Sequence, residues 1–461
     1  MNEQKYFNIT GVVLAAGKGT RMKSDRPKVL HTLLGTPMLW YVLNTMSALV
    51  EWQDLWTIIG YKSEEIISEF PDLSDRMVVQ PEQLGTGHAI QCCLPNIQRS
   101  DSDWCLVVNA DAPMLKFPIL EEFVNYSINS DISISFLTIE LEDPTGYGRI
   151  IRNSDGTVNS IVEEKDITDP EIRKINEVNA GVYIFSKQNL YNYLHLLSNE
   201  NKQQEYYLTE LIDISVRNNE RVHAFCAGNN PALLGINSPG ELIYCEETLK
   251  NNRNQDLLNA GVIIRNPSTV RIGPRAKISP NVDITGPVEI YGDSEIDPGT
   301  VVESHVVVQG CKVGAGCVLK SFSHLEDAKM DSHCEIGPFA RIRPGTTMDQ
   351  TAKVGNFVEV KKSHLKEGCK ANHLSYLGDA EVGEDVNIGA GCITCNFDGK
   401  NKHVSVIGNR SFIGSNTSLV APVTIGEDCL IGAGSTISKD VPENMLSIAR
   451  TKQKNLNKKM L

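Results

Sequence analysis

The sequence predicts two folds in succession: an α/β domain with a mostly parallel sheet, and then a parallel β-helix. Residues 1 to about 235 alternate between strand-like and helix-like segments, as in a sheet covered by helices. From about Val270 onward, aliphatic residues recur every six positions, which is the period of a parallel β-helix. A chain of 461 residues has room for two or three domains.

The first half supplies its elements in order. The predicted strands are Ile9–Leu14, Leu55–Gly60, Met77–Gln80, Trp104–Asn109, Ile132–Ile139 and Val178–Phe185. The predicted helices are Met38–Val50, Ser63–Phe70, Gly87–Leu94, Ile119–Asn129 and Glu205–Arg217. Ligands of such sheets bind at the carboxyl ends of the strands, so we expect the site there.

A glycine-rich segment directly follows the first predicted strand. It reads Leu-Ala-Ala-Gly-Lys-Gly-Thr-Arg-Met over residues 14–22, with Lys18 and Arg21 inside it and Lys28 soon after. Glycines let main-chain N–H groups surround an anion, and the basic residues add charge. The spacing matches neither the Walker A nor the dinucleotide motif. The segment predicts a nucleoside triphosphate site, with an ordinary strand–turn–helix as the alternative.

The second half begins after a polar helical stretch at residues 238–260. These patterns divide the chain into a first domain at 1–236, a linker helix at 237–262, a β-helix at 263–447 and a Lys-rich tail at 448–461. The hexad positions are Ile272, Ile278, Ile284, Ile290, Ile296, Val302 and Val308, then Val313, Leu319 and Leu325, then Met330, Ile336, Ile342, Met348, Val354 and Val360, and finally Ile407, Ile413, Leu419, Ile425, Ile431 and Ile437.

The hexad series has one large break. Thr394 and Ile407 are 13 residues apart where six are expected, so residues around 396–403 must leave the coil as a loop. Loops on a rigid scaffold often carry function, although a neutral surface insertion is the alternative.

Composition limits the classes of function. A net charge of −13 argues against a general affinity for nucleic acid. The chain shows no signal peptide and no apolar run of membrane-spanning length. Its 12 cysteines are scattered, which favours a reducing cytoplasm. Cys392 and Cys395 form a lone CxxC pair, for which we expect neither a metal nor a redox role.

Several motifs together resemble one enzyme family over residues 9 to about 450. They are LAAGKGTRM with Lys28, QLGTGH at 83–88, DPTGYGR at 143–149, RIRPG at 341–345, GNFVE at 355–359, HLSYLGD at 373–379 and NIGAG at 387–391. The chain resembles the bifunctional N-acetylglucosamine-1-phosphate uridyltransferase/glucosamine-1-phosphate acetyltransferases.

This resemblance implies an architecture and two reactions. The first domain would be a Rossmann-like nucleotidyltransferase, and the β-helix would be left-handed and would assemble as a homotrimer without nucleic acid or membrane insertion. The β-helix would acetylate glucosamine 1-phosphate from acetyl-CoA. The first domain would then transfer uridylyl from UTP with Mg²⁺, giving UDP-N-acetylglucosamine, a precursor of bacterial cell wall and lipopolysaccharide.

For uridylyl transfer, the resemblance assigns the metal to Asp111 and Asn237, and the stabilisation of charge on phosphorus to Lys28 and Arg21. It assigns UTP to Leu14, Ala15, Ala16, Gly17, Gly19, Lys28, Gln80, Gly85 and Thr86, and the sugar phosphate to Gly148, Glu163, Asn179 and Asn237. Without the resemblance, Asp111 would be interpreted as a helix N-cap and Asn237 as a turn residue.

For acetyl transfer, the resemblance assigns the general base to His373, which alone would be interpreted as a surface histidine. It assigns glucosamine 1-phosphate to Arg343, Lys361, Tyr376 and Asn387, and acetyl-CoA to Ala390, Asn396, Phe397, Ser415, Ala433 and Arg450. The site is expected to form between chains of the trimer.

The chain departs from the family pattern in three motifs. Asn109-Ala110 stand where the family usually has Tyr-Gly, Ala180 where it usually has Thr, and Phe397 where it more often has Tyr. Two competing hypotheses are a single-function sugar-1-phosphate nucleotidyltransferase with an oligomerising β-helix, and a non-catalytic scaffold. The residues matched on the β-helix argue against the first, and the intact glycine-rich loop argues against the second.

Overall fold

The computed structural model describes residues 7–456, and the chain forms two compact units, Met1–Glu246 and Glu247–Leu461. The division falls inside helix α8 (Pro239–Asn259), which confirms the helix expected there. The domain boundaries drawn from the sequence remain predictions. No helix among the described residues is long and apolar enough to cross a bilayer.

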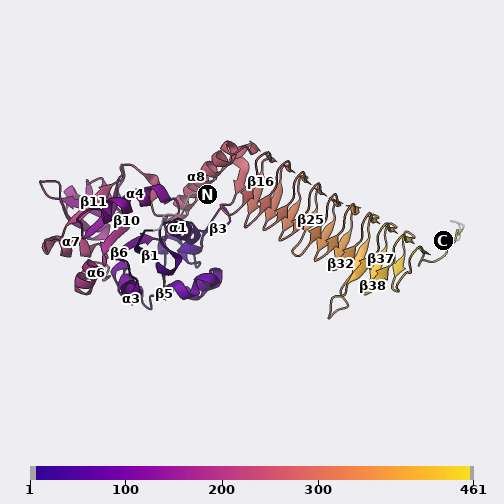
Figure 1. Ribbon diagram of the computed structural model, residues 1–461, viewed down its shortest axis with the longest axis horizontal. Helices are drawn as coiled ribbons and strands as arrows, with labels where there is room; N and C mark the ends of the chain where they lie inside the picture. The colour runs from indigo at the N-terminus through magenta and orange to yellow at the C-terminus, as the bar shows by residue number, and fades with distance from the viewer. Residues whose placement is uncertain (1–6, 457–461) are drawn as a thin grey trace. The chain divides into compact units, whose positions relative to one another are not determined.

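The first unit is built on one mixed sheet, with strands in the order β11-β7-β10-β6-β1-β4-β5 (Figure 1). Its strands are β1 (Ile9–Ala15), β4 (Leu55–Ile59), β5 (Met77–Val79), β6 (Trp104–Asn109), β7 (Ile134–Glu140), β8 (Arg149–Arg152), β9 (Val158–Val162), β10 (Glu177–Ser186) and β11 (Val222–Cys226), and β2 (Thr32–Leu33) pairs with β3 (Thr36–Pro37) apart from it. All six predicted strands are confirmed. The sequence analysis missed β8, β9 and β11, and β10 runs antiparallel to both β6 and β7.

Helices cover both faces of this sheet. They are α1 (Met38–Met46), α2 (Ser63–Glu69), α3 (Thr86–Arg99), α4 (Phe117–Ile128), α5 (Pro170–Arg173), α6 (Lys187–Tyr193) and α7 (Glu210–Arg217). Because successive side chains of a strand point to opposite faces, Val13 of β1 packs in the core with α1 and α4, and Val12 packs in the core with α3 and α7. The five predicted helices are confirmed, and α5 and α6 were not predicted.

The second unit is a coil of three parallel sheets of short strands, as the hexad pattern predicts (Figure 1). The first sheet contains β12 (Ile263–Arg265), β15 (Asp283–Thr285), β18 (Val301–Val302), β21 (Val318–Leu319), β24 (Glu335–Ile336), β27 (Lys353–Asn356), β30 (Lys370–His373), β33 (Asn387–Ile388), β36 (Phe412–Ile413), β39 (Leu430–Ile431) and β41 (Leu446–Ser447). The second contains β13 (Val270–Ile272), β16 (Val288–Tyr291), β19 (Val306–Gln309), β22 (His324–Glu326), β25 (Arg341–Ile342), β28 (Glu359–Lys361), β31 (Tyr376–Gly378), β34 (Ile393–Cys395), β37 (Ser418–Val420) and β40 (Thr436–Ile437). The third contains β14 (Lys277–Ile278), β17 (Glu295–Ile296), β20 (Lys312–Val313), β23 (Lys329–Met330), β26 (Thr347–Met348), β29 (His364–Leu365), β32 (Ala380–Val382), β35 (Ser405–Ile407) and β38 (Val423–Ile425).

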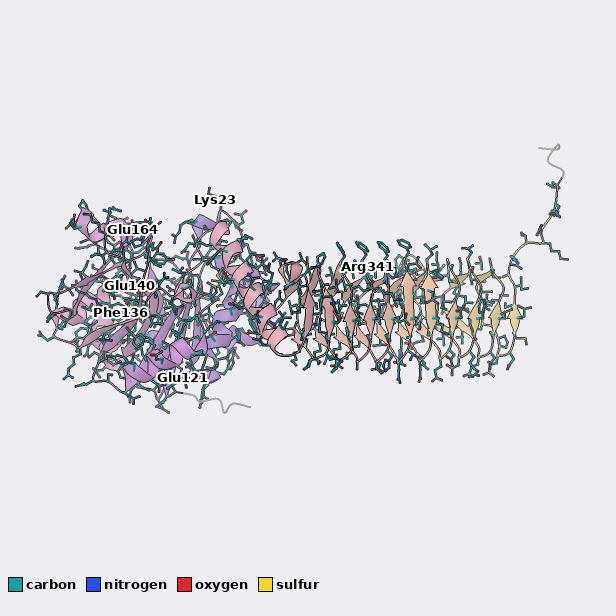
Figure 2. All side chains as sticks on the ribbon, turned by 90° about the horizontal axis from the view of Figure 1, so that it is seen from above. Lys23, Glu121, Phe136, Glu140, Glu164 and Arg341 are labelled. Carbon is teal, nitrogen blue, oxygen red and sulfur yellow. The ribbon has the colours of Figure 1, made fainter. Side chains whose placement is uncertain are left out.

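The hexad side chains fill the inside of this coil. Every predicted hexad residue belongs to its core, with Ile278 only partly buried, and other side chains form an outward fringe along the coil (Figure 2). Small residues occupy the second interior position, and six of these are cysteines: Cys311, Cys317, Cys334, Cys369, Cys392 and Cys429. Burial raises the pKa of the Cys311 thiol to about 11 and that of Cys369 to about 12, so both pack as small apolar groups.

The predicted loop leaves the coil between β34 and β35, close to β32 and β38 (Figure 1). Phe397 pairs with Lys402 in an antiparallel bridge, and His403 Nε2 lies 2.7 Å from Asp398 Oδ2. The surplus residues therefore form a hairpin with a defined shape.

One corner of the coil carries a column of stacked rings, which we call the corner stack: His305, Phe322, Phe339 and Phe357. Successive ring centroids lie 4.7, 4.8 and 5.2 Å apart. Phe339 and Phe357 are 46% and 57% exposed, so the stack presents apolar area to the surface.

The interior hexads should determine the stability of the coil. Ile342→Ala removes a fully buried side chain, and we expect it to destabilise the coil by about 2–5 kcal/mol. All four tryptophans, Trp40, Trp52, Trp56 and Trp104, lie in the first unit. In urea unfolding, the circular dichroism midpoint of the coil should therefore move to a lower urea concentration. The midpoint detected by tryptophan fluorescence, which reports the first unit, should not change.

The matched control is Arg341→Ala on the same strand, whose side chain points outward and is 47% exposed. It should change neither transition, and an equal effect of both substitutions would contradict the interior hexad model.

Candidate active sites

The glycine-rich loop joins β1 to a short 3-10 turn at Thr20–Met22. Gly19 has φ 65°, and a Cβ on it would lie 2.6 Å from the Cβ of Lys28. Only glycine meets both conditions without strain. Gly19 thus lets the loop pack directly against Lys28, as the sequence suggests.

Lys28 joins the two residues that the resemblance assigns to a metal. Its buried ammonium donates to Asp111 Oδ2 at 2.6 Å and to Asn237 Oδ1 at 2.8 Å. Asp111 follows the carboxyl end of β6, and Asn237 precedes α8. A Cβ on Gly235 would lie 2.9 Å from Asp111 Oδ1, so this glycine, which the sequence analysis did not select, leaves room beside the carboxylate.

These oxygens fit a magnesium ion. A carboxylate and an amide oxygen already converge on one cation, the Lys28 ammonium, and Mg²⁺ prefers such oxygen ligands. No cluster of three or more His, Cys, Asp or Glu residues suited to a metal occurs within residues 7–456. Phosphate oxygens or water would therefore complete the coordination.

A pocket opens beside this cluster at the carboxyl ends of β1 and β6 and along the first half of the antiparallel strand β10. Its lining includes Leu14, Arg21, Thr86, Asp111, Gly148, Glu163, Asn179 and Asn237 of the predicted residues, and Asn109, Gly146, Tyr147, Ala180, Gly181, Tyr183, Thr209 and Gly235 besides. The structure thus gathers the residues predicted for the sugar phosphate and for the metal in one cavity with Leu14, Arg21 and Thr86, whereas the other residues predicted for UTP do not line it. Two departures from the family pattern, Asn109 and Ala180, line it together, and a Cβ on Gly181 would lie 2.1 Å from the Asn109 amide nitrogen.

Gln80, Gly85 and Thr86 form a second, adjoining part of the site. Gln80 Nε2 donates to the Gly85 carbonyl at 3.0 Å, and Thr86 Oγ1 accepts from the Leu208 amide at 3.0 Å. Gly85 has φ 107°, and a Cβ there would lie 2.5 Å from the Tyr206 carbonyl oxygen. These contacts fix the turn that begins α3.

The residues predicted to contact the sugar are tied to neighbouring side chains in the pocket. Thr209 Oγ1 donates to Glu163 Oε1 at 2.9 Å, and Asn179 Nδ2 donates to the Tyr183 hydroxyl. Burial raises the pKa of Glu163, and the Thr209 hydrogen bond opposes that shift. Thr209 and Tyr183 lack any sequence motif of their own, so only the fold could identify them.

On the coil, three cations from separate segments converge. Arg343 follows β25 and donates to Glu359 Oε1 at 2.7 Å, and Lys361 ends the neighbouring strand β28. The positive charges of Arg343 and Lys402 lower the pKa of Lys361. Lys402 lies on the hairpin and was missed in the sequence, because its partners are some 40 and 60 residues away and only the excursion of the hairpin brings it to them. The cluster is suited to a phosphate.

His373 lies at the corner between two sheets of the coil. Its Nδ1 donates to Asn356 Oδ1 at 2.8 Å, which leaves Nε2 free to accept a proton. Asn356 pairs with His373 in register, one coil earlier. Asn356 was part of a quoted motif but was not selected as a site residue.

Tyr376 and Asn396 meet at Gly378. A Cβ on Gly378 would lie 2.4 Å from the Tyr376 hydroxyl and 2.8 Å from Asn396 Nδ2, which also donates to Asp379. Phe397, the third departure, is exposed on the hairpin. Asn387 pairs with Lys370 at the opposite end of strand β30 from His373, so no contact within one chain joins them.

Four of the residues assigned to acetyl-CoA, namely Ala390, Ser415, Ala433 and Arg450, follow strands of the same sheet as β30, the strand that ends at His373. Asn416 N donates to the Ala390 carbonyl, Gly434 N donates to the Ser415 carbonyl, and the Arg450 guanidinium donates to the Ala433 carbonyl. Ala390, Ser415 and Ala433 therefore form a column of small residues on successive coils. This column gives a ligand access to the corner.

The buried carboxyl of Glu163 leads to a prediction. The raised folded-state pKa means that the first unit loses stability as pH rises from the unfolded value, about 4.3, through the folded one. Glu163→Gln keeps an acceptor for Thr209 and abolishes this loss, so the variant should be the more stable one at neutral pH. Tryptophan-detected urea unfolding between acidic and neutral pH measures the difference, and a difference independent of pH would contradict the assignment.

Comparisons with known proteins agree with the two units. The nucleotidyl transferase family model matches residues 10–230, and the bacterial transferase hexapeptide (six repeats) model matches residues 405–439. The chain is 48% identical over 452 residues to the bifunctional protein GlmU of Nitratidesulfovibrio vulgaris strain DP4, covering 97% of this chain and 98% of that one.

Two further relatives give the same result. The bifunctional protein GlmU of Lawsonia intracellularis is 45% identical over 461 residues, with 100% of both chains covered. That of Cellvibrio japonicus is 40% identical over 445 residues, covering 96% of this chain and 97% of that one. The chain belongs to the GlmU family of bifunctional proteins.

Proposed function

We propose that each of the two activities of this bifunctional enzyme is carried out at one of the two sites described above. As a member of the GlmU family, the chain is a uridylyltransferase and an acetyltransferase that makes UDP-N-acetylglucosamine. Uridylyl transfer takes place in the first unit and acetyl transfer on the coil. The observation that carries this division is that each unit holds its own cations beside polar groups suited to one reaction. Lys28 lies beside Asp111 and Asn237 in the first unit, and the coil carries Arg343, Lys361 and Lys402 as well as the His373 and Asn356 pair.

In the first unit, an oxygen of N-acetylglucosamine 1-phosphate attacks the α-phosphorus of UTP, and pyrophosphate leaves. This reaction depends on positioning and charge stabilisation, because no covalent intermediate is needed. The glycine-rich loop holds the triphosphate, the turn at Gln80 and Gly85 holds uracil, and Glu163 and Asn179 orient the sugar. Lys28 and Arg21 stabilise the charge that develops on the phosphorus.

Asp111 and Asn237 would hold Mg²⁺ in this reaction. When bound, the ion would neutralise charge on the phosphate oxygens. Support comes from the convergence of both oxygens on one cation, the Lys28 ammonium.

On the coil, the amine of glucosamine 1-phosphate attacks the thioester carbon of acetyl-CoA. His373 Nε2 accepts the proton that the amine loses, and Asn356 holds the ring in the tautomer that permits this. The Ala390 N–H stabilises the oxyanion, and the thiolate of coenzyme A leaves. Arg343, Lys361 and Lys402 hold the sugar phosphate, and Tyr376 and Asn387 contact the sugar.

The active form is a homotrimer of chains joined through their coils. The corner stack supports this, because a column of exposed rings is the kind of apolar surface that a second copy covers. The stack also ends next to His373, so the same contact would bring a second chain to the acetyl site. The enzyme works in the cytoplasm, which its twelve free cysteines support.

If the two activities use separate sites, a substitution at one site should abolish only the activity of that site. We expect His373→Ala to lower acetyl transfer by about 10²-fold or more and to spare uridylyl transfer. Asp111→Ala should do the reverse, since it removes a metal ligand. Each activity is assayed alone, with glucosamine 1-phosphate and acetyl-CoA or with N-acetylglucosamine 1-phosphate and UTP. A folded variant at one site that loses both activities would refute the division.

The trimer prediction concerns the corner stack. Phe339→Ser combined with Phe357→Ser should shift sedimentation from trimer towards monomer and lower acetyl transfer, while uridylyl transfer persists. Phe412→Ser, another exposed ring on the coil but outside the corner stack, serves as the control. A double variant that remains trimeric would contradict the use of this surface.

A further inference from the structure

The loop at residues 143–148 forms one wall of the pocket in the first unit, since Gly146, Tyr147 and Gly148 line it. Hydrogen bonds hold the main chain of each of these three residues. Gly146 N donates to Glu164 Oε2 at 3.2 Å, the Tyr147 carbonyl accepts from the Arg149 guanidinium, and the Gly148 carbonyl accepts from Asn179 N at 2.9 Å. The wall is therefore fixed from behind through its backbone.

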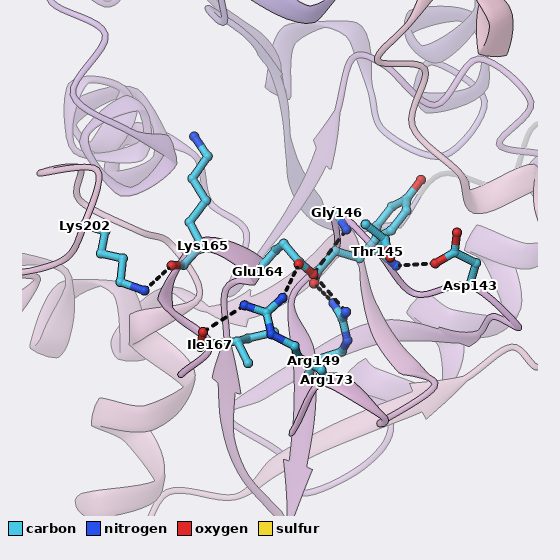
Figure 3. A network of polar contacts seen from close by, with 10 residues as sticks. Asp143, Thr145, Gly146, Arg149, Glu164, Lys165, Ile167, Arg173 and Lys202 are labelled. Carbon is cyan, nitrogen blue, oxygen red and sulfur yellow. Dashed lines mark hydrogen bonds and ion pairs between the residues drawn. The ribbon is translucent and has the colours of Figure 1, made fainter. Parts of the chain in front are cut away.

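Glu164 is the centre of this arrangement (Figure 3). Its Oε2 accepts from Arg149 Nη2 at 2.8 Å as well as from Gly146 N, and its Oε1 accepts from Arg173 Nη1 at 3.1 Å. One carboxylate thus ties the wall to β8 and to α5, which are remote from each other in sequence.

Burial makes this pairing important. The Arg149 side chain is only 2% exposed, and its Nε has no hydrogen-bond partner within the described part of the chain. A buried guanidinium that loses its carboxylate must move or draw in water, because an unpaired charge is poorly tolerated there. Any such movement passes to the Tyr147 carbonyl, which Arg149 holds.

Glu164 and its neighbour Glu163 have different positions relative to the pocket. Glu163, the preceding residue, lines the pocket, whereas Glu164 is not part of its lining and pairs instead with Arg149 and Gly146 N. A Cβ on Gly146 would have Arg21 Nη1 as its nearest atom, at 3.8 Å. The wall therefore lies between the sugar-facing carboxylate and a cation assigned to the phosphates.

We propose that Glu164 is a positioning residue for the sugar 1-phosphate: through Arg149 and Gly146 it sets where the 146–148 wall stands, without touching the substrate. This rests on the proposed assignment of the pocket to N-acetylglucosamine 1-phosphate. UTP depends on the glycine-rich loop and the Gln80–Gly85 turn, which Glu164 does not contact. The role should therefore affect the sugar substrate selectively.

The test compares three substitutions on one segment. Glu164→Gln keeps the size and an acceptor oxygen but removes the charge that pairs with Arg149. Arg173→Gln removes the contact with Glu164 Oε1 together with the hydrogen bond to the Ile167 carbonyl, and it leaves Arg149 and Gly146 paired. Glu171→Gln is the matched control. Among residues 7–456, the Glu171 carboxylate pairs with the exposed Lys174 alone, next to the same network. KM for N-acetylglucosamine 1-phosphate, KM for UTP and kcat are measured for each, with acetyl transfer as an internal check of integrity.

We expect Glu164→Gln to raise KM for the sugar phosphate roughly tenfold, because displacing a binding group by about 1 Å is costly. KM for UTP should stay within about twofold, Arg173→Gln should have a smaller effect, and Glu171→Gln should have none. An equal rise in both KM values, or a sugar KM equal to that of Glu171→Gln, would overturn the proposal.

Hydrogen exchange separates this proposal from the proposed function. In Glu164→Gln the peptide covering residues 143–149 should exchange faster than in the wild type, while peptides from the glycine-rich loop stay unchanged. This readout needs no substrate. Faster exchange without a selective KM change would overturn the positioning role, and a wild type inactive towards the sugar phosphate would overturn the proposed function instead. Should Glu164→Gln fail to fold, the same comparison between Arg173→Gln and Glu171→Gln decides the matter.

Discussion

The in-register stacking of aliphatic side chains inside the coil is the constraint on which the second site depends. Each hexad residue lies on an equivalent residue one coil earlier, and parallel pairing fixes this register along all three sheets. Outward residues 17 or 18 positions apart are consequently neighbours, which is how Asn356 meets His373 and Arg343 meets Lys361. A shift of one residue would turn the interior hexads outward and separate these pairs. The site is thus a product of core packing.

In the first unit, the topology of the sheet brings residues that are distant in the sequence into one site. Its parallel strands end at one edge of the sheet, so the loops after β1 and β6 bring Lys28 and Asp111 together from 83 positions apart. Polar groups gathered there are partly buried and must be paired, and the Lys28, Asp111 and Asn237 cluster and the Arg149 and Glu164 pair both meet that requirement. Burial at this edge of the sheet also raises the pKa of Glu163. The side chains proposed to bind the substrates are therefore also the ones that pair the buried polar groups with one another.

Much of this could be predicted from the sequence, because its signals are local and periodic. Six-residue spacing identified the coil and its core, and the 13-residue gap identified the hairpin. The strand that contains Leu14 and the strand that precedes Asp111 were also evident from their apolar runs.

The parts that could not be predicted depend on long-range pairing. The antiparallel placement of β10 follows from packing against β6 and β7, and Thr209, Lys402 and Glu164 acquire their roles only from segments distant in the chain. That Asn109 and Ala180 share one pocket was equally invisible in the sequence, where they are 71 positions apart.

The central claim is that one chain holds two working sites that act in succession. The most direct measurement is a single incubation with glucosamine 1-phosphate, acetyl-CoA, UTP and Mg²⁺, with the products identified by mass spectrometry. The account predicts UDP-N-acetylglucosamine, with N-acetylglucosamine 1-phosphate as the intermediate. Accumulation of that intermediate without the nucleotide sugar would contradict the assignment of the first unit. Consumption of neither sugar phosphate nor acetyl-CoA would contradict the assignment of the coil.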